Sequence, residues 1–132
     1  MSNSLLYTLN TNTQALAIGS QIDLGSIVRR YGQNINLSGD SILVKGGGYY
    51  NVSADVTITG TTAGTTTVNL VKDGTVIASS PVTVAVGAVV TIPVQAVVRE
   101  IGCCRDNTSN LTFVLTGTAE TVNQISVVVE KI

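Results

Sequence analysis

The stretch KGGGYYNVSADVTITG, residues 45–60, places three glycines and two tyrosines directly before a strictly alternating segment. Apolar side chains occupy every second position from Tyr50 to Ile58, and polar side chains occupy the positions between them. Because successive side chains of a β-strand point to opposite faces, this pattern predicts a long strand with one face in a core. Its other face would meet water or a polar interface. Glycine adopts positive φ without a steric penalty from Cβ, so Gly46–Gly48 predict a sharp reversal before the strand.

The rest of the chain reads as further short strands separated by turn residues. Asp73-Gly74 predicts a two-residue hairpin turn between strands at 65–71 and 75–79. Alternation also covers residues 90–98 and 111–116, and no segment with a helical period exceeds a turn or two. About ten strands with turn signals roughly every 8–12 residues are typical of an antiparallel β-sandwich or barrel.

Two prolines and the last segment indicate where strands lie within their sheets. Pro81 and Pro93 lack a backbone N–H, so each predicts an edge position, a bulge or a break. Residues 125–129 alternate, and the chain stays apolar almost to Ile132. A terminal strand of this kind predicts a central place in a sheet rather than a frayed end.

The composition is that of a β-protein with too little charge for its apolar content. Charged residues make up 11% of the chain and hydrophobic residues 44%, against a usual charged fraction of about a quarter. Colloidal stability normally depends on surface charge. We therefore expect other copies of the chain, or a larger particle, to cover much of its apolar surface.

Several functions are disfavoured by the residue inventory. The seven Lys and Arg are scattered, and Arg29-Arg30 is the one basic pair, so no patch suited to nucleic acid is visible. No apolar run approaches the ~18 residues of a membrane helix, and Met1–Leu6 does not resemble a signal peptide. We therefore expect synthesis in the cytoplasm, with neither nucleic acid nor membrane as partner. The sequence contains no histidine, and no evident base activates its Ser and Thr, so we predict no catalytic residue, no cofactor and no enzymatic activity.

The adjacent pair Cys103-Cys104 lacks the two-residue spacing of redox and zinc motifs. Two reduced thiols in a loop are the favoured interpretation, and a vicinal or intermolecular disulfide is the alternative. Asp106 next to Asn107, and Asp40 near Ser38, carry oxygen atoms of the kind that calcium prefers. These acids are isolated in sequence, so turn chemistry is the favoured interpretation and no metal site is predicted.

Four stretches carry a resemblance to a known module: DSILVKGGGYYNVSADVTITG, TTTVNLVKDGTVIASS, VVTIPVQAVVRE and LTFVLTGTAETVNQISVVVEKI. In order and spacing they resemble the jelly-roll module of tumour-necrosis-factor-like (TNF-like) and complement-C1q-like proteins. The closest likeness is to the C-terminal domains of collagen-like spore-surface glycoproteins and to phage head-decoration or head-fibre proteins. The resemblance covers most of residues 35–132 and is weaker over residues 1–34. It implies one jelly-roll domain over residues 1–132, with residues 1–34 as a candidate anchor.

This resemblance implies a ten-strand sandwich that assembles as a trimer around a threefold axis. Low charge on both sheet faces independently favours burying one of them between subunits. The candidate contacts lie on the non-core faces of the long strands, at Tyr49, Gln95, Val97 and Val128. The alternative for Tyr49 is an exposed ring beside a turn. Two features depart from the family pattern, since no collagen-like stalk precedes the domain and the loop IGCCRDNTSN is longer than usual.

The resemblance and the composition together favour a trimeric virion protein that decorates the capsid of a bacteriophage or forms a head fibre. Its partners would be two further copies and a capsid or other surface-layer protein. A spore-surface protein is the first alternative, and a C1q-like or lectin-like ligand-binding module is the second.

Overall fold

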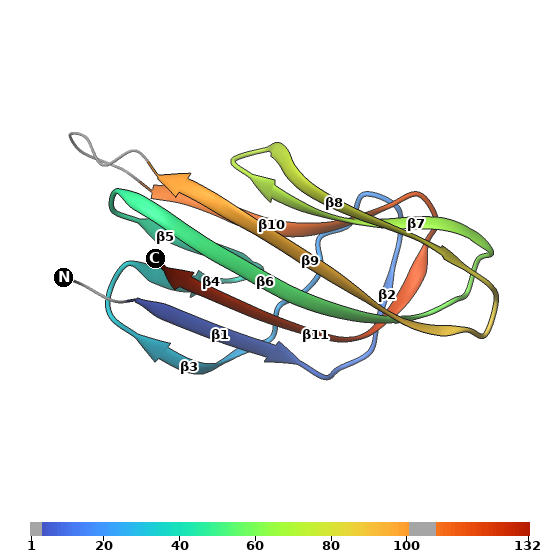
Figure 1. The fold of residues 1–132 in the computed structure, drawn as a ribbon. Helices are drawn as coiled ribbons and strands as arrows, with labels where there is room; N and C mark the ends of the chain where they lie inside the picture. The colour runs from blue at the N-terminus through green and yellow to red at the C-terminus, as the bar shows by residue number, and fades with distance from the viewer. Residues whose placement is uncertain (1–3, 101–107) are drawn as a thin grey trace.

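The computed structural model describes residues 4–100 and 108–132, which form two antiparallel β-sheets packed face to face (Figure 1). All the regular structure in these two ranges is strand. The strands are β1 (Leu5–Asn10), β2 (Gln14–Leu16), β3 (Ser26–Tyr31), β4 (Ile35–Ser38), β5 (Ser41–Lys45), β6 (Gly48–Thr59), β7 (Gly64–Lys72), β8 (Thr75–Val84), β9 (Val89–Glu100), β10 (Thr108–Thr116) and β11 (Glu120–Lys131). The predicted all-β sandwich is confirmed.

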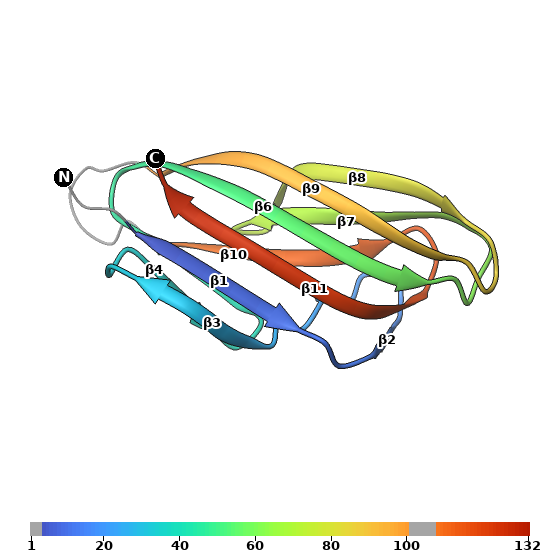
Figure 2. The ribbon, with the colours of Figure 1, turned by 60° about the horizontal axis from the view of Figure 1, so that its bottom comes forward.

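The six-stranded sheet has the order β3-β1-β11-β6-β9, with the short β2 also paired to β11. The five-stranded sheet has the order β4-β5-β10-β7-β8. Figure 2 shows β11 running between β1 and β6, so the predicted central position of the last strand is confirmed. Every pairing between these strands is antiparallel.

Both prolines lie on strands at the ends of their sheets, as predicted. Pro81 is in β8 at the edge of the five-stranded sheet, and Pro93 is in β9 at the edge of the six-stranded sheet. The two edges are in contact, and the Ser80 hydroxyl donates a hydrogen bond of 2.7 Å to the Pro93 carbonyl between them. One long side of the sandwich is therefore closed by contact between β8 and β9.

One continuous hydrophobic core fills the space between the sheets. Tyr50, Val52, Ala54, Val56 and Ile58 of β6 are all buried, which confirms the alternation that the sequence displays. Phe113 and its inward-facing neighbours on β10 pack against them from the opposite sheet. Burial of each large apolar side chain stabilises the fold by roughly 1.5–3 kcal/mol.

The glycine turn before β6 is tied to the core by Tyr50. Gly46 and Gly48 have φ values of 96° and 136°, a conformation that side-chain-bearing residues rarely adopt, so the predicted reversal is confirmed. The Tyr50 hydroxyl donates toward the carbonyl oxygens of Lys45 and Gly46, at 3.0 and 2.8 Å. Burial, and then the nearby negative charge of Glu100, raise the pKa of Tyr50 above its ordinary value. Tyr50 therefore stays protonated and able to donate at neutral pH.

The described residues hold eleven strands rather than the predicted ten, and several boundaries differ. One of the short strands that the sequence predicts, at residues 14–18, is β2, which ends at Leu16 and pairs with β11 beside the main path of the sheet. Strand β8 continues through Pro81 to Val84. This is possible because β8 is an edge strand, where a missing backbone N–H need not break the hydrogen bonding of the sheet. β10 includes Thr108–Asn110, ahead of the predicted 111–116, and in this part Ser109 faces inward and donates a hydrogen bond to the buried carboxylate of Glu100.

A segment that the sequence did not indicate, residues 17–24, runs beside β10 in place of a further strand. The Ile22 amide donates to the Phe113 carbonyl at 2.8 Å, and the Gly19 amide donates to the Leu115 carbonyl at 2.7 Å. Ile22 and Leu24 are fully buried in the core. Within the described ranges, no helix is long and apolar enough to cross a membrane.

Candidate subunit interface

The four candidate contact residues lie on one surface of the sandwich, the outer face of β11, β6 and β9. This outer face is the side of the six-stranded sheet that points away from the core. Tyr49 on β6 and Val97 on β9 are 53% and 61% exposed, Gln95 is exposed, and Val128 on β11 is half-buried. The prediction that these side chains lie on the non-core faces of long strands is confirmed, and their role in an interface remains a prediction.

The register of the strands brings the four residues into one patch. Val128 lies opposite Ser53, and Ser53 lies opposite Gln95, so these three form a row across β11, β6 and β9. In the next row, Val97 lies opposite Asn51, and Asn51 lies opposite the exposed Glu130 of β11. Neighbouring strands are about 4.8 Å apart, so Val128 and Gln95 are separated by about 10 Å. Tyr49 adds its ring one further row along, beside Arg99.

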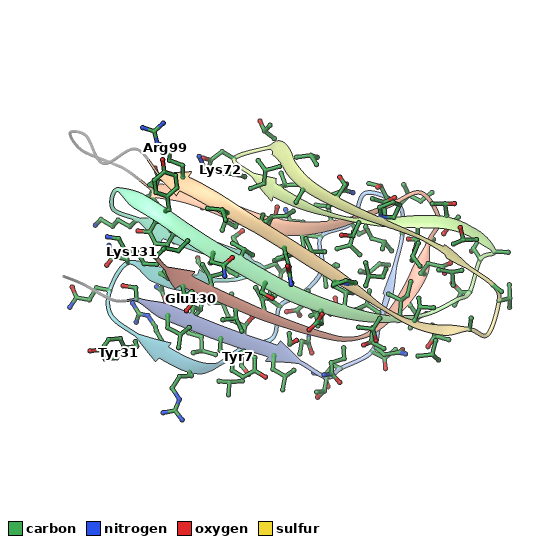
Figure 3. The ribbon with its side chains drawn as sticks, viewed as in Figure 1. Tyr7, Tyr31, Lys72, Arg99, Glu130 and Lys131 are labelled. Carbon is green, nitrogen blue, oxygen red and sulfur yellow. The ribbon has the colours of Figure 1, made fainter. Side chains whose placement is uncertain are left out.

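The middle of the outer face has little charge. Along the outward positions of β6 and β9 it presents Asn51, Ser53, Asp55, Thr57, Thr91, Pro93, Gln95 and Val97, of which Asp55 alone is ionisable. The hydroxyls of Thr57 and Thr91 lie 3.2 Å apart across the two strands. Figure 3 shows Arg99, Glu130, Lys131 and Lys72 in the half of the sandwich that holds the C-terminus.

Such a face suits burial against another protein surface. The backbone groups of β11 and β6 are paired within the sheet on both sides, so covering this face leaves few backbone donors or acceptors without a hydrogen bond. Short hydroxyl and amide side chains can hydrogen-bond across a contact without the desolvation cost of charges. Tyr49 offers a large apolar area together with a hydroxyl that needs a partner.

The sequence candidates for thiol and metal chemistry have different outcomes. Cys103, Cys104, Asp106 and Asn107 lie outside the described residues, so the predictions on them stay predictions. Asp40 lies near Asp23, and these two carboxyls are a pair rather than a ligand shell. Among residues 4–100 and 108–132 there is no group of three or more His, Cys, Asp or Glu that could hold a metal ion.

The pair of carboxyls predicts a pH-dependent effect on stability. Burial, and then the charge of Asp23, raise the pKa of Asp40 above its ordinary value of 3.8. The folded state therefore binds this proton more tightly than the unfolded state, and stability falls as pH rises from about 4 through the folded-state pKa. Asp40→Asn should raise the free energy of unfolding at pH 7 by less than about 1 kcal/mol, because solvent screens the pair. Urea unfolding at pH 7 and pH 3.5 checks this, and an equal gain at both pH values would contradict it.

Buried polar residues that the sequence did not flag connect strands to one another and to the loop after β6. Glu120 is 1% exposed, and one carboxylate oxygen accepts a hydrogen bond of 2.8 Å from the Thr62 amide. Asn69 donates to the Thr116 hydroxyl at 2.8 Å and accepts from Ser79. Position was an available signal for Glu100, which continues the inward-facing set of β9. It was none for Glu120, because a register shift between Val122 and Gln124 changes which positions of β11 face inward.

Comparisons with known proteins bear on the fold. No family model and no curated protein sequence matches the chain. Solved structures do match, including murine APRIL at 14% identity and a TM-score of 0.75, over 99% of this chain and 100% of that one. The globular domain of the zebrafish complement 1qA protein matches at 8% identity and a TM-score of 0.72, over 96% and 94%. The PRD1 vertex protein P5 matches at 16% identity and a TM-score of 0.64, over 97% of this chain and 72% of that one.

The class of the protein follows from the strand order and these likenesses. The chain has the jelly-roll fold of TNF-like and C1q-like proteins, as its sequence resemblance indicated. At this level of identity the likeness establishes the fold, and function has to be argued from the surfaces of this chain.

Proposed function

We propose that this chain is a non-enzymatic structural protein that assembles as a homotrimer and decorates the surface of a virion, as a bacteriophage capsid decoration or head-fibre protein. The trimer is closed through the outer face of β11, β6 and β9. The observation that supports this proposal is that the face combines exposed Tyr49 and Val97 with a middle of mostly short side chains, in which Asp55 is the one ionisable group on β6 and β9. A chain with 11% charged residues gains most by covering such a surface.

The virion assignment is supported by likeness in fold to a vertex protein, the PRD1 protein P5. A vertex protein is by name a component of a larger particle. The low charge of the chain suits the same role, because a particle as well as sister subunits can cover apolar surface.

Residues 1–34 are proposed as the anchor to the particle. All six residues of β3 are exposed, and its Ile27, Val28 and Tyr31 are 40%, 52% and 64% exposed. β3 is also the edge of its sheet, and an edge strand presents unpaired backbone groups to a partner. An exposed apolar edge strand of this kind is a natural place for another protein to pair and pack.

Purified virions provide the test of this function. Mass spectrometry and antibody labelling should find the protein on intact particles, in a copy number divisible by three. Val28→Ser with Tyr31→Ser should reduce the amount bound to particles while the trimer persists in solution. Recovery from spore surfaces alone, or the absence of the protein from every particle fraction, would contradict the virion assignment.

A further inference from the structure

A groove of about 320 Å³ lies on the opposite side of the molecule from the candidate interface. It is formed on the outer face of the five-stranded sheet by β5, β7, β10 and residue Gln21 of the segment beside β10. Its volume is at the lower end of the range for small-molecule sites. A trimer closed through the six-stranded sheet would leave this groove accessible in every copy.

The groove is lined by two half-buried valines and by polar side chains, of which Thr112 is the most buried. Val71 lies opposite Thr112 across β7 and β10, and Val114 follows two residues later on the same face, beside Gln21. The other side chains of the groove that can hydrogen-bond to a ligand are Ser41, Asp73 and Asn110. Among residues 4–100 and 108–132, no lysine or arginine lines the groove, so an anionic ligand would find no counter-charge from this part of the chain.

The carboxylate of Asp73 is held in place before any ligand arrives. One of its oxygens accepts a hydrogen bond of 2.9 Å from the Asn110 amide, and the Asp73 amide donates to the Asn110 carbonyl at 3.0 Å. Asp73 adopts a φ of 49°, which the Asp-Gly hairpin turn requires. A pinned acceptor loses little conformational entropy when it binds a ligand hydroxyl.

The other polar groups of the groove are free to serve a ligand. Within the part of the chain that the structure describes, the side chains of Gln21, Ser41, Asn110 and Thr112 make no hydrogen bond. Two amides and two hydroxyls supply both donors and acceptors, and Asp73 supplies a charged acceptor. Val71 and Val114 supply methyl groups that can pack on a C–H surface.

From this combination we infer that the groove binds a neutral sugar, with its C–H face on Val71 and Val114 and its hydroxyls on Asp73, Asn110 and Gln21. A pyranose ring is apolar on its faces and carries hydroxyls around its edge, and so matches two valines set among polar side chains. A shallow site of this size binds weakly, with a Kd on the order of 1 mM for each copy. Three copies on one trimer would strengthen binding to a clustered glycan.

The test is a titration of the ¹⁵N-labelled protein with glucose, galactose, mannose and N-acetylglucosamine, each to about 50 mM. At least one sugar should shift amide signals around residues 21, 41, 71–74 and 110–114, and leave the outer face of β11, β6 and β9 unchanged. Asp73→Asn keeps the acceptor for the Asn110 amide and tolerates positive φ, and it should weaken binding at least fivefold. Gln21→Ala is the second variant, and Asp55→Asn on the other sheet is the matched control that should bind as the unaltered chain does.

Three results would overturn this inference. They are no shift with any of the four sugars, shifts that map elsewhere, and a response to Ca²⁺ alone, which would make the groove a cation site. The titration detects binding at the groove whether the protein is a monomer or a trimer, so a negative result would not contradict the proposed assembly. The reverse also holds, because a monomeric protein could still bind sugar here.

Discussion

Val97→Arg is expected to turn the proposed trimer into monomers at micromolar concentration. Val97 is 61% exposed in the single chain, so arginine costs the fold little. In the assembly the same side chain would be covered beside Asn51, two strands away from Glu130 in the same row, and its charge would lose contact with water. Desolvating that charge costs about 3 kcal/mol or more at each contact, which is more than a 100-fold loss in affinity. Sedimentation velocity of both proteins at matched concentrations measures the change.

Ile18→Arg is the matched control for this substitution. Ile18 is also 61% exposed and β-branched, and it lies on the segment of residues 17–24 that runs beside β10 of the other sheet. It should leave the sedimentation coefficient unchanged. If both variants dissociate, general surface charge rather than the outer face governs assembly, and if neither does, the interface lies elsewhere.

Gly117→Ala is expected to lower the free energy of unfolding by about 3 kcal/mol or more. Gly117 has a φ of 91°, where a side chain costs about 1–2 kcal/mol. A Cβ at this position would also overlap the carbonyl oxygen of Thr65 and lie 3.3 Å from the Thr66 Cα. The turn would have to move away from β7, and the Thr66 hydroxyl would lose its contacts of 3.3 Å with the carbonyls of Thr116 and Thr118.

Gly87→Ala separates the steric effect from the backbone effect. Gly87 has a similar φ of 83°, but a Cβ there would meet nothing within 4 Å. Its cost should be about 1 kcal/mol. Urea unfolding of the two variants at one protein concentration gives the comparison, and equal losses would show that the contact with β7 has no energetic weight.

The sequence was sufficient where a local pattern decides the structure. The alternation of residues 50–59 placed Tyr50 and Ile58 in the core and left Tyr49 outside it, as observed. The apolar end of the chain placed β11 in the middle of its sheet, because such a strand would be poorly solvated at an edge. Alternation likewise put Gln95, Val97 and Val128 on the outer face.

Features that depend on long-range pairing could not be predicted. Ile22 and Leu24 are buried because residues 17–24 bind the free side of β10, and nothing local in AIGSQIDL specifies that partner. The groove joins Gln21, Asp73 and Asn110, which are distant in sequence and meet only through the order of the strands. The same holds for the low charge in the middle of the outer face, which depends on the register of β6 against β9.

The mass of the unaltered protein in solution, measured by light scattering at micromolar concentration, tests the central claim most directly. The outer face of β11, β6 and β9 predicts one species at three times the chain mass of 13.6 kDa. A single species of 13.6 kDa would show that this surface stays open to water, and the proposed building block would be wrong.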